Sequence, residues 1–173
     1  MRRQPVPALP LFFALLLLLA ACTPPQKTAL QEQERVLRQV MLNWAVLGQM
    51  PAGIDVPFPD GHMLARYNTI VVQDDGSTAN RELQLTNRQV VILDLEAIRT
   101  RANAEGDFLY LRFEHVEVHD EEATIRFGLA WALSKATRES GRLPLNCDGA
   151  EVLFRRQDGR WVADRILSLW RSY

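Results

Sequence analysis

Cysteine and histidine are scarce in this sequence: its 173 residues include two cysteines and three histidines. Two cysteines exclude the disulfide-rich scaffold on which many small secreted proteins depend. The sequence also contains no Gly-rich phosphate loop, no Gly-x-Ser-x-Gly and no Cys-x-x-Cys. Because these patterns accompany nucleotide binding, serine hydrolysis and thiol redox chemistry, the usual signs of an enzyme are missing. We therefore predict no catalytic residue and no cofactor.

Neither sign of charge is in excess, because 20 Lys and Arg residues stand against 21 Asp and Glu, for a net charge of -1. Nucleic acids and anionic lipid surfaces bind clustered positive charge, so neither is expected as a partner. Hydrophobic residues make up 47% of the chain and charged residues 24%. This composition predicts a packed core rather than disorder, and the length fits one domain.

The sequence has one long apolar run, residues 11–19, which follows Arg2 and Arg3 and precedes two alanines. These are the three parts of a secretory signal peptide, which we place at residues 1–21. The run is too short to cross a bilayer, which takes about 20 apolar residues in a helix. Without this leader, 18 basic residues stand against 21 acidic ones, and the rest of the chain is more acidic than the whole.

The leader ends in Leu19-Ala20-Ala21-Cys22, which resembles the lipobox of bacterial lipoproteins. The resemblance implies that Cys22 carries a thioether-linked diacylglycerol, that the chain is cut before it, and that the new amine receives a fatty acid such as palmitate. Thr23 stands where an Asp would favour the inner membrane, so the resemblance implies an outer-membrane protein facing the periplasm. The alternative is an ordinary secretory signal followed by a chance cysteine. With Cys22 lipidated, Cys147 has no partner for an internal disulfide and is expected to be a buried structural residue.

The part of the chain after the leader is predicted to be a short tether followed by one domain. Residues 22–27 form the lipid-bearing tether, which its prolines keep extended. Residues 28–173 form a single α+β domain that begins with a helix over residues 28–48, with Thr28 as its cap. One face of this helix is apolar: Leu30, Leu37, Val40, Met41, Trp44 and Leu47.

Turn signals and strand patterns alternate through the rest of the domain. Residues 50–63 are rich in proline and glycine and are predicted to form a loop, either a rim or lid or a simple crossover. A second helix over residues 94–103 is capped by Asp94, is stopped by Gly106, and turns its apolar residues inward: Leu95, Ile98 and Ala102. Strands are predicted at residues 65–73, 83–86, 89–93, 108–119, 123–137, 151–156 and 160–169, with a bulge near Glu114.

The last hairpin reads Asp158-Gly159-Arg160-Trp161-Val162. Together with the long first helix and the long hairpins before it, this motif resembles the nuclear transport factor 2-like, cystatin-like cone superfamily, from about Thr28 onward. The resemblance implies N-terminal helices packed on a curved, mainly antiparallel sheet, with Trp161 against the helix. Residues 67–93 are where the superfamily pattern is expected to break. The superfamily includes enzymes, ligand-binding proteins and scaffolds, so the fold leaves the function open.

Two groups of residues are candidates for chemistry. His115, Glu117 and His119 alternate along one strand and share a face, so they are weak candidates for metal ligands; the alternative is an ordinary solvated strand end. The second group would form an acid–base site in a cone pocket: Tyr110, Arg112, Glu114 and Trp131. For Arg112 and Glu114 we favour cross-strand pairing on the surface.

These observations favour a membrane-anchored envelope lipoprotein that is not an enzyme and serves as a binding or assembly module. Its expected partners are the membrane, through the lipid on Cys22, and a protein of the envelope. The alternative is a small-ligand carrier or an enzyme that uses an open cone pocket. An interior plugged by Trp44, Trp131 or Phe127 would argue against that alternative.

Overall fold

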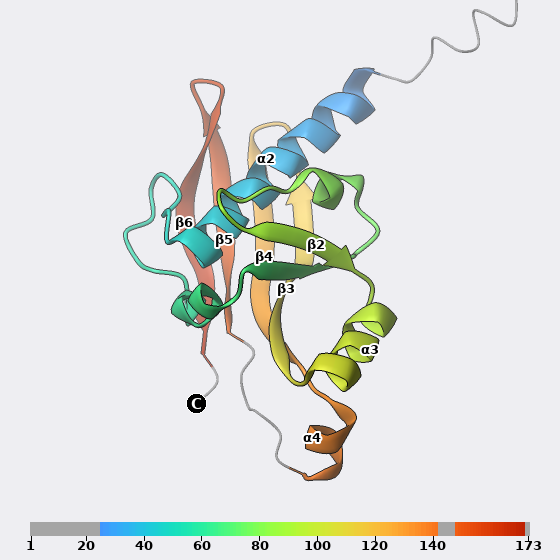
Figure 1. Ribbon diagram of the computed structural model, residues 1–173. Coiled ribbons are helices and arrows are strands. Elements are labelled where there is room, and N and C mark those ends of the chain that lie inside the picture. The colour runs from blue at the N-terminus through green and yellow to red at the C-terminus, as the bar shows by residue number, and fades with distance from the viewer. Residues whose placement is uncertain (1–24, 142–147, 172–173) are drawn as a thin grey trace, which may run out of the picture.

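The computed structural model of the protein describes residues 25–141 and 148–171, with the side chains of the first helix from Ala29 on. The predicted leader, Cys22 and Cys147 lie outside the described residues. The architecture is α+β, as the sequence predicts, with helices packed on a curved, mainly antiparallel sheet (Figure 1). The elements are α2 (Pro25–Leu47), η1 (Gly61–Arg66), β1 (Thr69–Gln73), η2 (Thr78–Glu82), β2 (Gln89–Leu93), α3 (Leu95–Glu105), β3 (Phe108–Val118), β4 (Glu122–Ala132), α4 (Lys135–Glu139), β5 (Gly149–Gln157) and β6 (Arg160–Trp170).

The six strands of the sheet lie in the order β2-β1-β3-β4-β5-β6. From β3 to β6, neighbours pair antiparallel in chain order. β1 pairs in parallel with both β2 and β3. We call the face against α2 the inner face and the face on which α3 packs the outer face. Among the described strands, β2 lies at one edge of the sheet and β6 at the other.

The segment between β1 and β2 departs from the sequence prediction, which put a return strand at residues 83–86. The carboxylates of Asp74 and Asp75 accept backbone N–H groups of Gly76 and Ser77, at 2.9 and 3.0 Å. These bonds turn the chain into η2, whose start the Ser77 hydroxyl caps. The chain then enters β2 parallel to β1 instead of pairing back along it. The predicted strand at residues 83–86 is therefore wrong: the Gln84 backbone bonds to the side chain of Gln39 on α2, and Leu85 forms an isolated bridge with Arg88.

The helix α2 begins at Pro25, so residues 25–27 of the predicted extended tether are helical. Proline is tolerated in the first turn of a helix because its missing N–H has no partner there. Thr28 lies inside the helix and is not its cap, so that prediction is also wrong. Leu37, Met41 and Trp44 are buried as predicted, whereas Leu30 is 46% exposed.

The short helices are set by local side-chain caps. Asp94 accepts the Ala97 N–H at 2.7 Å, and Gly106, with φ of 94°, ends α3, both as predicted. Leu95 was expected to face inward but is 44% exposed. The strand predicted over residues 123–137 ends at Ala132, because Ser134 caps α4.

The turns of the last strands follow the sequence closely. The register of β3 on β4 shifts between Phe113 and His115, which confirms the bulge predicted near Glu114. The last hairpin turns through Asp158 and Gly159, at φ of 51° and 76°. Positive φ at both central residues is what a two-residue hairpin needs, and Asp-Gly supplies it.

Candidate functional site

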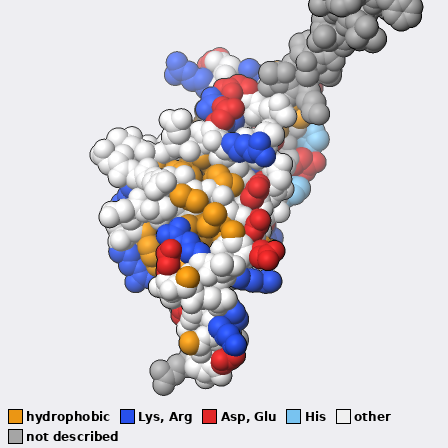
Figure 2. Space-filling view, turned by 45° about the vertical axis from the view of Figure 1, so that its right-hand side comes forward, with side chains coloured by type: hydrophobic (Ala, Val, Ile, Leu, Met, Phe, Trp, Pro, Cys, Tyr) orange, Lys and Arg blue, Asp and Glu red, His pale blue; other side chains and the backbone are white. Residues whose placement is uncertain are grey.

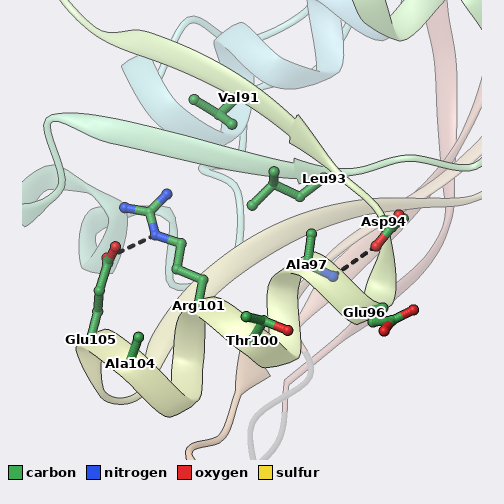
Figure 3. Close-up of a pocket in the computed structure, with 9 residues that line it drawn as sticks. All are labelled: Val91, Leu93, Asp94, Glu96, Ala97, Thr100, Arg101, Ala104 and Glu105. Atoms are coloured by element: carbon green, nitrogen blue, oxygen red, sulfur yellow. Dashed lines mark hydrogen bonds and ion pairs between the residues drawn. The ribbon is translucent and has the colours of Figure 1, made fainter.

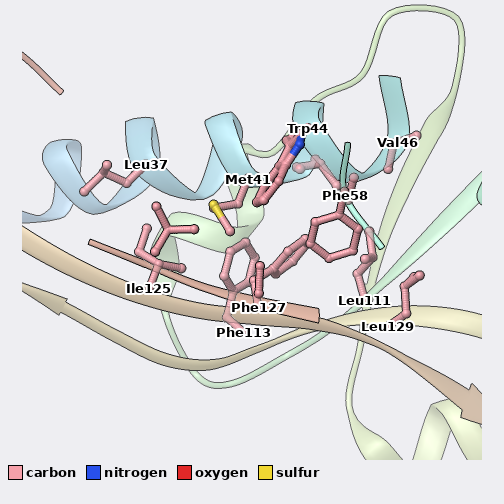
Figure 4. Close-up of a cluster of buried hydrophobic side chains, with 14 of the residues drawn as sticks. Leu37, Met41, Trp44, Val46, Phe58, Leu111, Phe113, Ile125, Phe127 and Leu129 are labelled. Atoms are coloured by element: carbon pink, nitrogen blue, oxygen red, sulfur yellow. The ribbon is translucent and has the colours of Figure 1, made fainter. Parts of the chain in front are cut away.

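The space between α2 and the inner face is filled by aromatic side chains (Figure 4). The Trp44 ring meets Phe58 edge-on, with centroids 5.1 Å apart, and Phe127 lies 5.7 Å from Phe58. Phe113 lies 4.4 Å from Phe127 and completes the row. Trp44 and Phe127 are at most 1% exposed. Among the described residues, these rings occupy the place where a cone pocket would be.

The loop before η1 closes the end of this core, which favours the crossover over the lid. The Trp44 indole donates to the Val56 carbonyl at 3.1 Å, and the Ala163 N–H donates to the Ala52 carbonyl at 2.8 Å. Gly53 is required because a Cβ there would lie 2.1 Å from the Ala163 carbonyl oxygen. The loop is thus bonded to both α2 and β6.

His115, Glu117 and His119 do converge, as their alternation predicts. The Nε2 atoms of His115 and His119 lie 3.3 and 2.9 Å from the two carboxylate oxygens of Glu117. All three side chains are more than half exposed. Within the described residues, no group of three or more His, Cys, Asp or Glu has an arrangement that holds a metal ion. The three residues therefore have the features of a solvated strand end.

We expect His119→Ala to raise the pKa of Glu117. Hydrogen bonds from His119 and then His115 hold this pKa below the ordinary value of 4.5. Because the folded-state pKa is depressed, this stabilisation exists above the ordinary pKa and is lost as pH falls through the folded value. Carboxyl chemical shifts followed by NMR titration measure the change, and His62→Ala is the control that leaves Glu117 unaffected. An unchanged pKa in His119→Ala would contradict the assignment of its cause.

The second predicted group does not assemble into one site. Arg126 of β4 binds Glu114 of β3 at 2.8 Å, which confirms the predicted cross-strand pairing for Glu114, and Arg112 binds Glu114 along the same strand at 2.6 Å. Tyr110 is 7% exposed and packs near α3, and Trp131 packs against the core of the inner face. Tyr110 and Trp131 line a common hollow of about 230 Å³ beside α3, and Arg112 and Glu114 are not among the residues that line it.

A buried ion network joins α2 to the turn after β1, and no sequence pattern predicted it. Arg38 is 3% exposed, and its guanidinium contacts Glu34 at 2.7 Å, Asp75 at 2.8 Å and Asn80 at 2.9 Å. It also lies 4.4 Å from the centroid of the Phe113 ring. Because the Arg38 guanidinium is bonded to all of these groups, the role of the network is structural: it holds the turn after β1 against α2.

An apolar groove lies at the free edge of the sheet between β2 and α3 (Figure 3). Val91 and Leu93 project from β2 on one side. Ala97, Thr100 and Ala104 form the other side, at three- and four-residue spacing along α3. These small side chains leave an open space of about 560 Å³. We call this site the β2–α3 groove, and four charged residues complete its rim: Asp94, Glu96, Arg101 and Glu105.

Three of the four charged residues that line the groove are already engaged by neighbouring groups. Arg101 is bonded to Glu105 at 2.8 Å and lies over the Phe108 ring, 5.3 Å from its centroid. Asp94 is engaged as the cap of α3. In the view of Figure 2, hydrophobic side chains gather in the middle of one face, with charged side chains among them. An apolar floor whose charged neighbours Asp94, Arg101 and Glu105 are engaged is suited to contact with apolar side chains rather than to catalysis.

Comparisons with known proteins do not extend this description: no protein-family model, curated protein or solved structure matches the chain. In the part of the chain that the structure describes, no helix is both long and apolar enough to cross a membrane. Cys22, the predicted lipid site, lies outside the described residues.

Proposed function

We propose that the protein is a lipid-anchored module of the bacterial envelope that acts by binding other proteins through its surface. The observation that carries the proposal is the filled interior. Trp44, Phe58 and Phe127 are buried in contact with one another, so among the described residues their rings fill the middle of the inner face, where a small ligand or substrate would sit. The apolar β2–α3 groove is open at the surface instead.

The lipid anchor that the sequence predicts also supports the proposed function. The lipobox Leu19-Ala20-Ala21-Cys22 implies diacylglycerol on Cys22 and acylation of its amine. Two or more acyl chains hold a protein on a bilayer firmly, whereas one gives marginal binding. The proposed location is the periplasmic face of the outer membrane. A domain held there meets partner proteins at a raised effective concentration.

The test is crosslinking of the full chain in native membranes. A photo-crosslinking residue at Thr100, inside the groove, is expected to give a reproducible protein adduct. The same residue at Glu139, exposed on α4, is the matched control and is expected to give none. The paired variant Cys22→Ser should lose its palmitate label and move from the membrane to the soluble fraction.

The carrier or enzyme alternative predicts different results. It requires that the native chain gain a small added mass from envelope extract, read by native mass spectrometry. A small added mass together with no protein adduct at Thr100 would defeat the proposed function. A Cys22→Ser chain that stayed membrane-bound would defeat the anchor.

A further inference from the structure

The outer edge of β2 presents backbone N–H and C=O groups that have no partner within the described sheet, and the register of β2 on β1 tells which residues they belong to. The Gln89 N–H donates to the Asn68 carbonyl, and the Leu93 carbonyl accepts from the Asp74 N–H, so these two residues direct their backbone toward β1. In a parallel ladder alternate residues bond to the same neighbour. The N–H and C=O groups of Val90 and Ile92 therefore point away from the sheet. Among the described residues, no strand pairs with this edge.

Apart from its short length, this edge lacks the features that protect edge strands. Charged side chains, prolines and bulges normally prevent pairing with another chain. β6, at the opposite edge, has Arg160, Asp164 and Arg165, and its pairing with β5 is interrupted by register shifts. The segment Gln89–Leu93 has no charged residue and no proline, and its register with β1 is unbroken.

We propose that β2 pairs antiparallel with β2 of a second copy of this chain, about a two-fold axis at Val91. This register places Val90 opposite Ile92 of the second copy, and Ile92 opposite Val90 of the second copy. All four residues then present outward N–H and C=O groups, so both pairs exchange their hydrogen bonds. An interface of this kind is self-complementary, as two-fold symmetry requires.

The side chains fit the same register. On the outer face, Val91 meets Val91 of the second copy, and the two β2–α3 grooves adjoin across the axis. Beyond the apolar pairs, Arg88 lies opposite Asp94 of the second copy, which brings opposite charges together at both ends. The Arg88 guanidinium donates one hydrogen bond to the Leu64 carbonyl, at 3.0 Å, and its other N–H groups can donate to Asp94.

This inference rests on the proposed function, because the anchor confines the copies to one surface and raises their effective concentration. Five-residue strands bury little area by themselves, so the pair depends on the raised local concentration of anchored copies. The interface then makes one continuous sheet from two chains.

The test is disulfide crosslinking of the full, lipid-anchored chain in native membranes, in a Cys147→Ser background. At the axis, Val91 of the two copies would form a non-hydrogen-bonded pair with Cα atoms about 4.5 Å apart, which suits a disulfide. Val91→Cys is expected to give a band of twice the chain mass without reductant. Gln89→Cys is the control, because its two copies would lie about 13 Å apart along the strands.

The expected result is a crosslinked fraction at least about tenfold greater for Val91→Cys than for Gln89→Cys, because only the first meets disulfide geometry. Equal crosslinking at both positions, or none at Val91→Cys, overturns the proposal. The detergent-solubilised full chain should be a dimer by light scattering and become a monomer in Val91→Lys, with Val91→Thr still dimeric. A monomeric chain that still gives heterologous adducts at Thr100 would end this inference and leave the proposed function standing.

Discussion

Arg38→Met is expected to lower the free energy of unfolding by about 3–5 kcal/mol, as removal of one partner from a buried ion network does. The substitution keeps much of the side-chain volume, so its effect comes mainly from charge and lost hydrogen bonds. Glu34 and Asp75 would be left close together, with Asn80 also missing a donor. Urea unfolding followed by circular dichroism measures the loss.

The matched control is Arg35→Met, one helical turn earlier on α2. Arg35 also forms ion pairs, with Glu32 and Glu82, but its side chain is 30% exposed. Such surface pairs contribute about 0–1 kcal/mol, so this variant should remain near wild-type stability.

A triple variant separates charge from packing. Adding Glu34→Gln and Asp75→Asn to Arg38→Met removes the uncompensated carboxylates and should restore part of the lost stability. Equal losses in Arg38→Met and Arg35→Met would show that the network contributes no more than a surface pair.

The sequence predicts well those elements that depend on local patterns. The alternation of Leu109, Leu111 and Phe113 places all three on the inner face, where they are buried. The Asp94 cap, the bulge near Glu114 and the Asp158-Gly159 turn are likewise confirmed. In each case the signal and its structural consequence lie within a few residues of each other.

The failures depend on contacts between distant parts of the chain or on competing caps. Arg38 lies among apolar residues of α2, and its partners Asp75 and Asn80 are about 40 residues away in sequence, so spacing alone does not reveal the network. The parallel entry of β2 depends on that same turn. α4 replaced the end of a predicted strand because Asp107 accepts bonds from Ser134 and Thr137, each at 2.7 Å.

In the candidate sites, too, features set by local patterns were predictable, and features set by contacts between distant segments were not. The convergence of His115, Glu117 and His119 follows from strand alternation and was predictable. The β2–α3 groove was not, because it exists only where an uncharged edge strand meets the small residues of α3. Its separate signals were present in Gln89–Leu93 and in the spacing of Ala97, Thr100 and Ala104, but only the fold brings them side by side.

Phe127→Ala is expected to cost about 3–5 kcal/mol of unfolding free energy and to create an apolar cavity that the wild-type chain does not have. Phe127 is fully buried and contacts Phe113 and Phe58, so no solvent can replace its ring. The control Leu167→Ala, at a side chain 45% exposed, should change stability by less than about 1 kcal/mol.

The cavity gives a direct test of the filled interior. Apolar cavities of this kind stay dry and bind small aromatic molecules. Benzene should therefore raise the melting temperature of Phe127→Ala and leave that of the wild type unchanged, because a ligand that binds only the folded state stabilises it. A rise in the wild type would mean that Trp44, Phe58 and Phe127 leave usable space on the inner face. In that case the carrier alternative, rather than a surface-binding module, would become the better account of the fold.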